Sequence, residues 1–293
     1  MKDTTKLRLI KILAIVLFAL LYIIIEAFAL APSRLTISYH TYYTDQISED
    51  LDEFSIIFFS DLHLGTTYTS SNIQVIQDKI NLLQGDIVLF GGDLLDHPSL
   101  LADENEIEAL VTMLSGIEAK YGKYAVLGNH DLETKDTEDT VIDILERGGF
   151  EIITNTSLRV HAGSDSSIRL IGLDSGVNGD PNVSKAYKEV RGSDLNVLLC
   201  HTPDSISTVN SALTDIMVSG HSHGHQVYIP LISQYFLPAQ GQNYNRGEYY
   251  LNDSYLLVSN GVGTTKIQAR LFAESEINFL RLRYKAKEEN TIE

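Results

Sequence analysis

The chain has 293 residues, of which 44% are hydrophobic and 21% charged, and its formal net charge is -17. This composition excludes a disordered protein and allows one large α/β domain, and the acidic balance excludes the clustered Lys and Arg of a nucleic-acid-binding surface. Cys200 is the only cysteine, so an intrachain disulfide is excluded and the redox compartment is left open.

The first feature along the chain is an apolar segment, Ile12 to Ala31, whose length of about 20 residues matches one helical crossing of a bilayer. The residues before it are basic, which by the positive-inside rule keeps the N-terminus in the cytoplasm. Ala29-Leu30-Ala31 resembles a signal-peptide cleavage site, but Pro32 directly after it disfavours cleavage. We therefore expect residues 1–33 to form a basic flank and a single-pass anchor in the cell membrane, and residues 34–293 to form an extracytoplasmic domain. A cleaved signal would export the same domain.

The next part of the chain alternates predicted strands and helices. Period-two alternation at residues 35–39 predicts a half-buried strand, and three apolar runs predict buried strands at residues 54–59, 86–90 and 124–127. Apolar residues at helical spacing predict helices at residues 73–83, 107–117 and 141–145. Ser71 and Asn72 are expected to cap the first helix, and Gly85 to end it. Strands alternating with helices predict a parallel sheet whose carboxyl ends meet at one edge.

Beyond Gly148-Gly149 the pattern favours strands. Apolar segments predict a second, mixed or antiparallel sheet, with strands at residues 152, 158–160, 168–173, 195–199, 216–218, 256–259 and 277–282. Residues 229–253 are rich in Tyr, Gln, Asn and Gly without helical period, which predicts a long loop partly over the site. The fold class is therefore α/β (α+β).

Polar side chains follow the ends of several predicted strands. They are Asp61, His63, Asp93, Asn129, His201, His221 and His223. Carboxylate, amide and imidazole ligands suit Mn, Fe or Zn, and the lack of thiolates argues against a closed structural zinc site. This set is sized for two divalent metal ions, which could share a bridging carboxylate and a bridging water. The pKa of such a water falls toward neutrality, giving a hydroxide for in-line attack on phosphorus.

The order of these residues resembles the five motifs of the calcineurin-like metallophosphoesterases. The matching motifs are Asp61-x-His63, Gly92-Asp93, Gly128-Asn129-His130-Asp131, the lone His201 and Gly220-His221-x-His223. The tail from Gly261-Val262-Gly263-Thr264 through Arg270 to Ile277 further resembles the membrane-anchored or exported bacterial branch of the family. The resemblance implies a two-sheet β-sandwich flanked by helices.

The resemblance also implies two ligand sets: Asp61, His63 and His223 for one metal, and Asn129, His201 and His221 for the other. Asp93 would bridge the two ions.

Further roles are implied for residues that are not ligands. His130 matches the catalytic histidine, which contacts a phosphate oxygen and helps to protonate the leaving alkoxide. Asp96 matches a carboxylate that orients that histidine in some members. His225 departs from the usual last motif; it could contact substrate or add a metal ligand, but we expect it to face solvent or to pack.

We therefore predict a metallophosphoesterase that hydrolyses a phosphomonoester, phosphodiester or pyrophosphate. The alternative is a non-catalytic, metal-dependent binding or sensing protein for a phosphorylated envelope ligand, which the intact His130 disfavours.

An anchor close to the site makes a lipid-linked substrate attractive, and aromatic residues of the predicted loop are candidates to hold an acyl chain or a sugar: Tyr235, Phe236, Tyr244, Tyr249 and Tyr250. The sequence leaves the ester class, the metal and the oligomeric state open.

Overall fold

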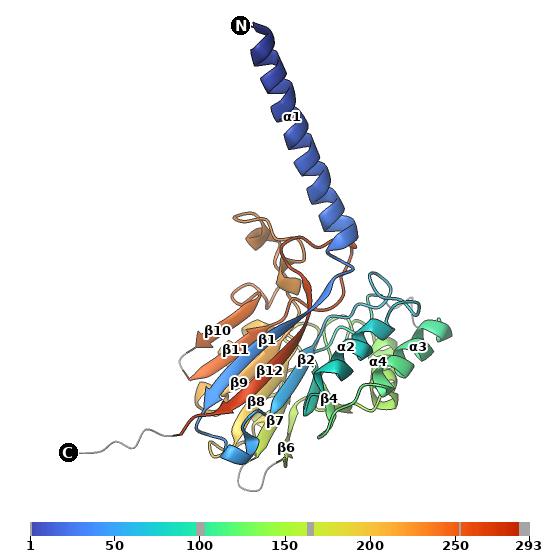
Figure 1. Cartoon of the computed structure of the whole chain (residues 1–293). Coiled ribbons are helices and arrows are strands. Elements are labelled where there is room, and N and C mark those ends of the chain that lie inside the picture. The colour runs from blue at the N-terminus through green and yellow to red at the C-terminus, as the bar shows by residue number, and fades with distance from the viewer. Residues whose placement is uncertain (1, 98–102, 163–166, 252, 287–293) are drawn as a thin grey trace, which may run out of the picture.

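The computed structural model describes residues 2–97, 103–162, 167–251 and 253–286. A long helix projects from a domain in which two six-stranded sheets pack against each other (Figure 1). The first sheet has the order β1 (Leu35–Thr44), β12 (Ser275–Tyr284), β2 (Ser55–Phe59), β3 (Ile87–Phe90), β4 (Lys123–Ala125) and β5 (Glu151–Ile152). The second has the order β10 (Gly247–Leu251), β11 (Ser254–Val258), β9 (Ile216–Ser219), β8 (Leu195–Cys200), β7 (Ile168–Leu173) and β6 (Thr156–Val160).

Three apolar layers hold the domain together. Between the first sheet and its helices lies a core that includes Ile57, Phe90 and Leu114. These helices are α2 (Gln74–Leu83), α3 (Glu104–Ser115) and α4 (Lys135–Arg147). A second core fills the space between the two sheets. A third core covers the outer face of the second sheet, under α5 (Val183–Ala186) and the 3-10 helix η4 (Pro203–Thr208). Further short turns are η2 (Glu49–Leu51), η5 (Ser211–Leu213), η6 (His223–His225) and η7 (Ser233–Phe236).

The parallel strands bring their carboxyl ends to one edge, as predicted. β2, β3, β4 and β5 pair in parallel, and so do β7, β8, β9 and β11. The antiparallel pairs are β12 with β2, β6 with β7, and β10 with β11. The predicted sandwich of mixed sheets flanked by helices is confirmed.

Two strands lie in the other sheet from the one predicted. β5, which contains Ile152, and β12 both join the first sheet. β12 buries apolar side chains on both faces, with Ile277 and Phe279 against the helices and Leu280 and Leu282 between the sheets. A strand that is apolar on both faces carries no periodicity that assigns it to one sheet.

Local signals at the ends of elements were partly misread. Asn72 Oδ1 accepts the N–H of Thr69 at 2.8 Å, so it stabilises the turn before α2, and no side-chain cap is found at that helix start. Gln84, at φ 49°, ends α2 one residue before Gly85. The expected loop at 229–253 contains η7 and the edge strand β10, which pairs with β11.

The projecting helix α1 (Lys2–Ile25) continues as a π-helical turn, η1 (Glu26–Leu30). Thr4–Leu30 spans 27 residues, is long and apolar enough to cross a membrane, and is 6% buried over its most apolar part. Such exposure sets it apart from the core helix of a soluble domain. It has the length and composition that a membrane anchor or a signal sequence requires.

Candidate metal centre

The seven predicted ligand residues converge where the carboxyl ends of strands from both sheets meet. Asp61 and His63 follow β2, Asp93 follows β3, and Asn129 follows β4. From the second sheet, His201 follows β8, and His221 and His223 follow β9. Six of them, all except Asn129, contribute to overlapping groups whose ligand atoms lie within 4.8 Å of one another: Asp61, His63 and His223; His63, Asp93 and His130; and Asp93, His201 and His221.

The first group joins two imidazoles and a carboxylate. His63 Nε2 and His223 Nε2 lie 3.1 Å apart, and His223 Nε2 lies 3.6 Å from Asp61 Oδ1. All three side chains are buried. Two ring nitrogens and a carboxylate oxygen therefore face one small volume.

In the second group, hydrogen bonds to main-chain carbonyls aim the imidazoles at the site. His201 Nδ1 donates to Gly91 O and His221 Nε2 donates to Ala239 O, each at 2.7 Å. The opposite nitrogens, His201 Nε2 and His221 Nδ1, then face each other at 3.3 Å. Asn129 Oδ1 lies 3.1 Å from His201 Nε2. Such carbonyl contacts fix the ring orientation of metal-binding histidines.

Asp93 lies between the two groups. Its Oδ2 is 3.4 Å from His63 Nε2 and 3.2 Å from His201 Nε2, while its Oδ1 accepts the N–H of His130 at 2.8 Å. One carboxylate thus contacts both imidazole sets, which is the position that a bridging ligand requires.

The pKa values of the four buried histidines depend on burial and on the charged side chains beside them. Burial alone would lower the pKa of His63, but the carboxylates of Asp93 and Asp96 outweigh it and raise that pKa to about 10. The same opposition, with Asp93 as the partner, raises the pKa of His201 to about 9. Burial, aided by a neighbouring histidine in each case, lowers the pKa of His221 and of His223, so both favour the neutral form that binds metals.

The main chain is strained at the same residues. Asp61, His63, Asp93, His221 and His223 all have positive φ, between 44° and 73°. A non-glycine residue in this region costs about 1–3 kcal/mol and persists only where the surroundings enforce it. Gly128 is required beside them, because a Cβ there would lie 2.1 Å from Asp93 Oδ1. Such clustering of strain is characteristic of functional sites.

His130 has a different partner from the one predicted. Its Nδ1 lies 2.9 Å from Glu133 Oε1, whereas Asp96 Oδ1 lies 3.2 Å from His63 Nδ1 and Asp96 Oδ2 lies 3.3 Å from His97 Nε2. The expected contact of Asp96 with His130 is therefore corrected: the Asp96 carboxylate lies beside His63, and the Glu133 carboxylate lies beside His130. The sequence placed Asp96 near the site and assigned no role to Glu133, because only the path of the loop decides which ring each carboxylate reaches.

Asp131 is a structural residue of the site to which the sequence assigned no role. Its carboxylate is fully buried and accepts the N–H groups of Asp93, Leu94 and Gly128 at 2.8 to 2.9 Å. It thereby ties the loop after β3 to the loop after β4. Its place in the motif Gly128-Asn129-His130-Asp131 was the available signal.

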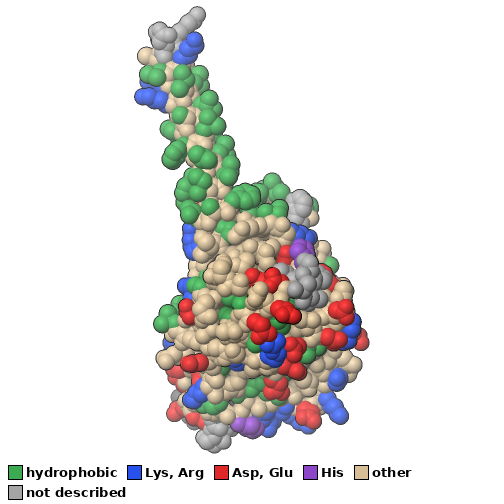
Figure 2. Space-filling view, turned by 90° about the vertical axis from the view of Figure 1, so that its right-hand side faces the viewer, with side chains coloured by type: hydrophobic (Ala, Val, Ile, Leu, Met, Phe, Trp, Pro, Cys, Tyr) green, Lys and Arg blue, Asp and Glu red, His purple; other side chains and the backbone are tan. Residues whose placement is uncertain are grey.

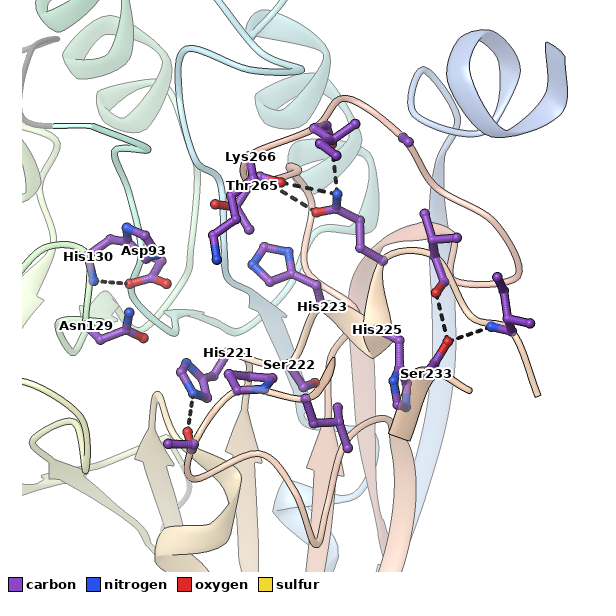
Figure 3. A pocket seen from close by; sticks show the side chains of 18 of the residues that line it. Asp93, Asn129, His130, His221, Ser222, His223, His225, Ser233, Thr265 and Lys266 are labelled. Carbon is purple, nitrogen blue, oxygen red and sulfur yellow. Dashed lines mark hydrogen bonds between the residues drawn. The ribbon is translucent and has the colours of Figure 1, made fainter. Parts of the chain in front are cut away.

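A cavity of about 850 Å³ opens over these residues. Figure 3 shows Asp93, Asn129 and His130 on one side of it, facing His221 and His223 on the other. His225 also lines the cavity and packs its ring 5.3 Å from that of Tyr228. His225 therefore packs against Tyr228 and also borders the space that a substrate would occupy.

The donor set fits a pair of divalent cations. Nitrogen and oxygen atoms from separate strands face one another in pairs, and a cation between them satisfies such pairs better than a shared proton does. Carboxylate, amide and imidazole donors without thiolate suit Mn, Fe or Zn.

Comparison with known protein families matches residues 54–225, more than half of the chain, to the calcineurin-like phosphoesterases. An uncharacterized metallophosphoesterase of Bacillus subtilis, YkuE, is 27% identical over 254 residues, which cover 87% of each chain. The phosphodiesterase YaeI of Escherichia coli is 27% identical over 236 residues, or 78% of this chain and 82% of the relative. A transmembrane protein with a metallophosphoesterase domain from Danio rerio is 27% identical over 253 residues, or 82% of this chain and 55% of the relative.

Proposed function

The chain belongs to the calcineurin-like phosphoesterase family and is a hydrolase of phosphoric esters, and we propose that it cleaves them with two divalent metal ions held at the strand ends. Asp61, His63 and His223 would hold one ion. Asn129, His201 and His221 would hold the other, and Asp93 would bridge them. The observation that carries this proposal is the contact of one Asp93 oxygen with both His63 and His201.

Bound at these positions, the ions would supply an acidified water as the nucleophile and positive charge against the phosphate oxygens. His130 lies at the edge of the same group, half-buried and facing the cavity, where it can contact a phosphate oxygen and give a proton to the leaving alkoxide. The Glu133 carboxylate lies 2.9 Å from its Nδ1, which leaves Nε2 for the substrate. Asp131 fixes the loop that carries Asp93 relative to the loop that carries His130.

The test is hydrolysis of p-nitrophenyl phosphate and bis-p-nitrophenyl phosphate by the full-length chain, with Mn, Fe, Zn and Mg supplied in parallel. The diester belongs in the panel because the E. coli relative is named a phosphodiesterase. We expect turnover of at least one ester with at least one metal. Ester binding without turnover under every condition would instead support the non-catalytic binding protein.

We also propose that residues 1–33 anchor the chain in the cell membrane and that the catalytic domain, residues 34–293, lies outside the cytoplasm. The exposed apolar helix and its basic flank support this, and a relative named as a transmembrane protein agrees with it. Protease added to intact cells should degrade the domain. Protection of the domain until the membrane is opened would contradict this orientation.

A further inference from the structure

The cavity over the metal centre extends to the foot of the projecting helix. Its lining includes Asp93 and His223 at one end and Phe28, from η1, at the other. Between them the wall is mainly apolar, with Val227, Ile229, Ile232, Leu237, Pro238, Ile267 and Ala269. Small-molecule sites occupy about 300–1,000 Å³, so a volume of about 850 Å³ leaves room for much more than a phosphate group.

One cation lies in this lining. Lys266 is the only Lys or Arg among the described residues that border the cavity, and Figure 3 shows it above the space between Asp93 and His223. Its φ is 63°, and Gln226 holds the flanking main chain by bonds to Thr265 N, Thr265 O and Ile267 O. A lysine held in a strained conformation beside a phosphate site is placed to bind an anionic oxygen.

Exposed apolar side chains lie in the cavity lining, at Phe28 and Ile267, and on the neighbouring parts of the segments that line it. We call the following residues the apolar rim: Phe28 (57% exposed), Leu231 (84%), Tyr235 (78%), Ile267 (60%) and Phe272 (71%). Residues 226–240 contain no Asp, Glu, Lys or Arg, although the chain as a whole is strongly charged. Figure 2 shows hydrophobic side chains continuing from the helix onto the domain around its foot.

The foot of the helix is fixed to the segment that carries part of this rim. Ala27 O accepts the N–H of Arg270 at 2.8 Å. Arg34 joins Glu26 at 3.0 Å and Glu274 at 3.1 Å. If the helix spans a bilayer, these contacts hold the apolar rim at the depth where the helix leaves it.

We propose that the substrate is a phosphate ester of a membrane lipid, which enters the cavity from the bilayer across the apolar rim. The hydrocarbon chain lies along the apolar wall, Lys266 holds an anionic oxygen, and the phosphorus reaches the metal centre. Water adds to phosphorus, the P–O bond to the lipid breaks, and the lipid leaves as its alcohol with a proton from His130. This inference rests on the proposed function and names its substrate class.

Matched substrate pairs test the chemistry, with the full-length chain in lipid nanodiscs. Each pair shares a phosphate group and differs in its hydrocarbon: dioleoyl phosphatidic acid with glycerol 3-phosphate, dioleoyl phosphatidylglycerol with glycerophosphoglycerol, and a long-chain isoprenyl monophosphate with isopentenyl monophosphate. We expect kcat/KM to favour the lipid by about 100-fold in at least one pair, because chain methylenes add binding energy. Equal or lower values for the lipid in all three pairs, with measurable hydrolysis, would overturn the inference and leave the proposed function intact.

The contact with the bilayer can be tested without catalysis. The chain contains no tryptophan, so Leu231→Trp introduces a single fluorophore into the apolar rim. Leu82→Trp is the matched control, because Leu82 is 77% exposed in the last turn of α2, which leads into the start of β3 and so lies at the edge of the sheet opposite the metal centre. Brominated lipids in the nanodisc should quench the fluorophore at 231 strongly and that at 82 weakly. Equal, weak quenching at both positions would overturn the membrane entry.

The role of Lys266 is tested by Lys266→Gln, with the exposed Lys188→Gln as control. We expect KM for the preferred ester to rise about ten-fold at Lys266 and to stay unchanged at Lys188, because one charge-assisted contact is lost. An unchanged KM for Lys266→Gln would remove this residue from the proposal.

Discussion

His63 and His223 place their Nε2 atoms 3.1 Å apart although 160 residues separate them in the sequence. Each ring comes from a different sheet, and each residue is held at positive φ. Two imidazoles share at most one proton across such a contact, while a divalent cation accepts a lone pair from both. The fold therefore keeps strained backbone at both residues, and this strain brings the two rings together. The short distance between the rings supports a metal ion bound by Asp61, His63 and His223.

Removing the bridging charge should abolish both metal binding and activity. Asp93→Asn keeps the shape of the side chain but loses the anion that contacts His63 and His201. We expect the unchanged chain to bind about two ions and the variant to lose its bound metal. We expect kcat/KM of the variant to be lower by about 1,000-fold or more. Metal analysis after gel filtration and a p-nitrophenyl phosphate assay measure the two quantities. Full metal content in this variant would remove Asp93 from the bridge.

His130→Ala should separate metal binding from catalysis. His130 is not among the proposed ligands, so the variant should keep its metal content and lose about 100- to 10,000-fold in kcat through the missing proton donor. The loss should be smaller for p-nitrophenyl phosphate than for an alkyl phosphate, because nitrophenolate leaves without a proton. Equal losses for the two leaving groups would contradict a proton-donor role.

The two carboxylates near the site should behave differently when neutralised. Asp96→Asn acts on His63, so it should weaken metal affinity by about 10- to 100-fold. Glu133→Gln acts on His130, so it should lower kcat without changing metal affinity. Metal titration measures the metal affinity of both variants, and steady-state kinetics measure their kcat. The opposite pattern would restore the predicted pairing of Asp96 with His130.

Lys123, which lies far from the site, should make the free energy of unfolding depend on pH. Its Nζ donates to Leu114 O at 2.8 Å and Gly148 O at 2.6 Å, tying the ends of α3 and α4, so Lys123→Met should cost about 2 kcal/mol of unfolding free energy. Burial lowers the pKa of Lys123 below its usual 10.5, so the unfolded chain binds the proton more tightly. Stability from this residue therefore rises as the pH increases from the folded pKa to 10.5. Urea unfolding of the unchanged chain and of Lys123→Met should show that their difference in unfolding free energy is larger at pH 10 than at pH 8. An equal difference at the two pH values would argue against the lowered pKa of Lys123.

Much of the site follows from local sequence. Asp61, Asp93 and His201 each come after a buried apolar run, and parallel strands must bring such positions to one edge. The ring partners could not be predicted in this way. Glu133 is three residues after His130, whereas Asp96 is far in sequence from both His63 and His130, and the loop path, which depends on Asp131 and Gly128, selects the contact.

The sheet assignment failed where pairing joins distant segments. β12 lies between β1 and β2, and its register with β1 joins Leu35 to Ser275. Such pairing depends on the whole core and leaves no local pattern. The apolar rim could not be predicted as a unit either, because its residues come from segments far apart in the sequence, and the helix foot meets one of them through the bond of Arg270 N–H to Ala27 O.

The most direct test of the central claim is a metal titration of the metal-free, full-length chain with Mn²⁺, with bound metal and phosphate-ester hydrolysis measured in the same samples. The account predicts no hydrolysis without metal and activity that rises with occupancy until about two ions are bound per chain. Full activity in the metal-free chain, or with only one ion bound, would contradict it.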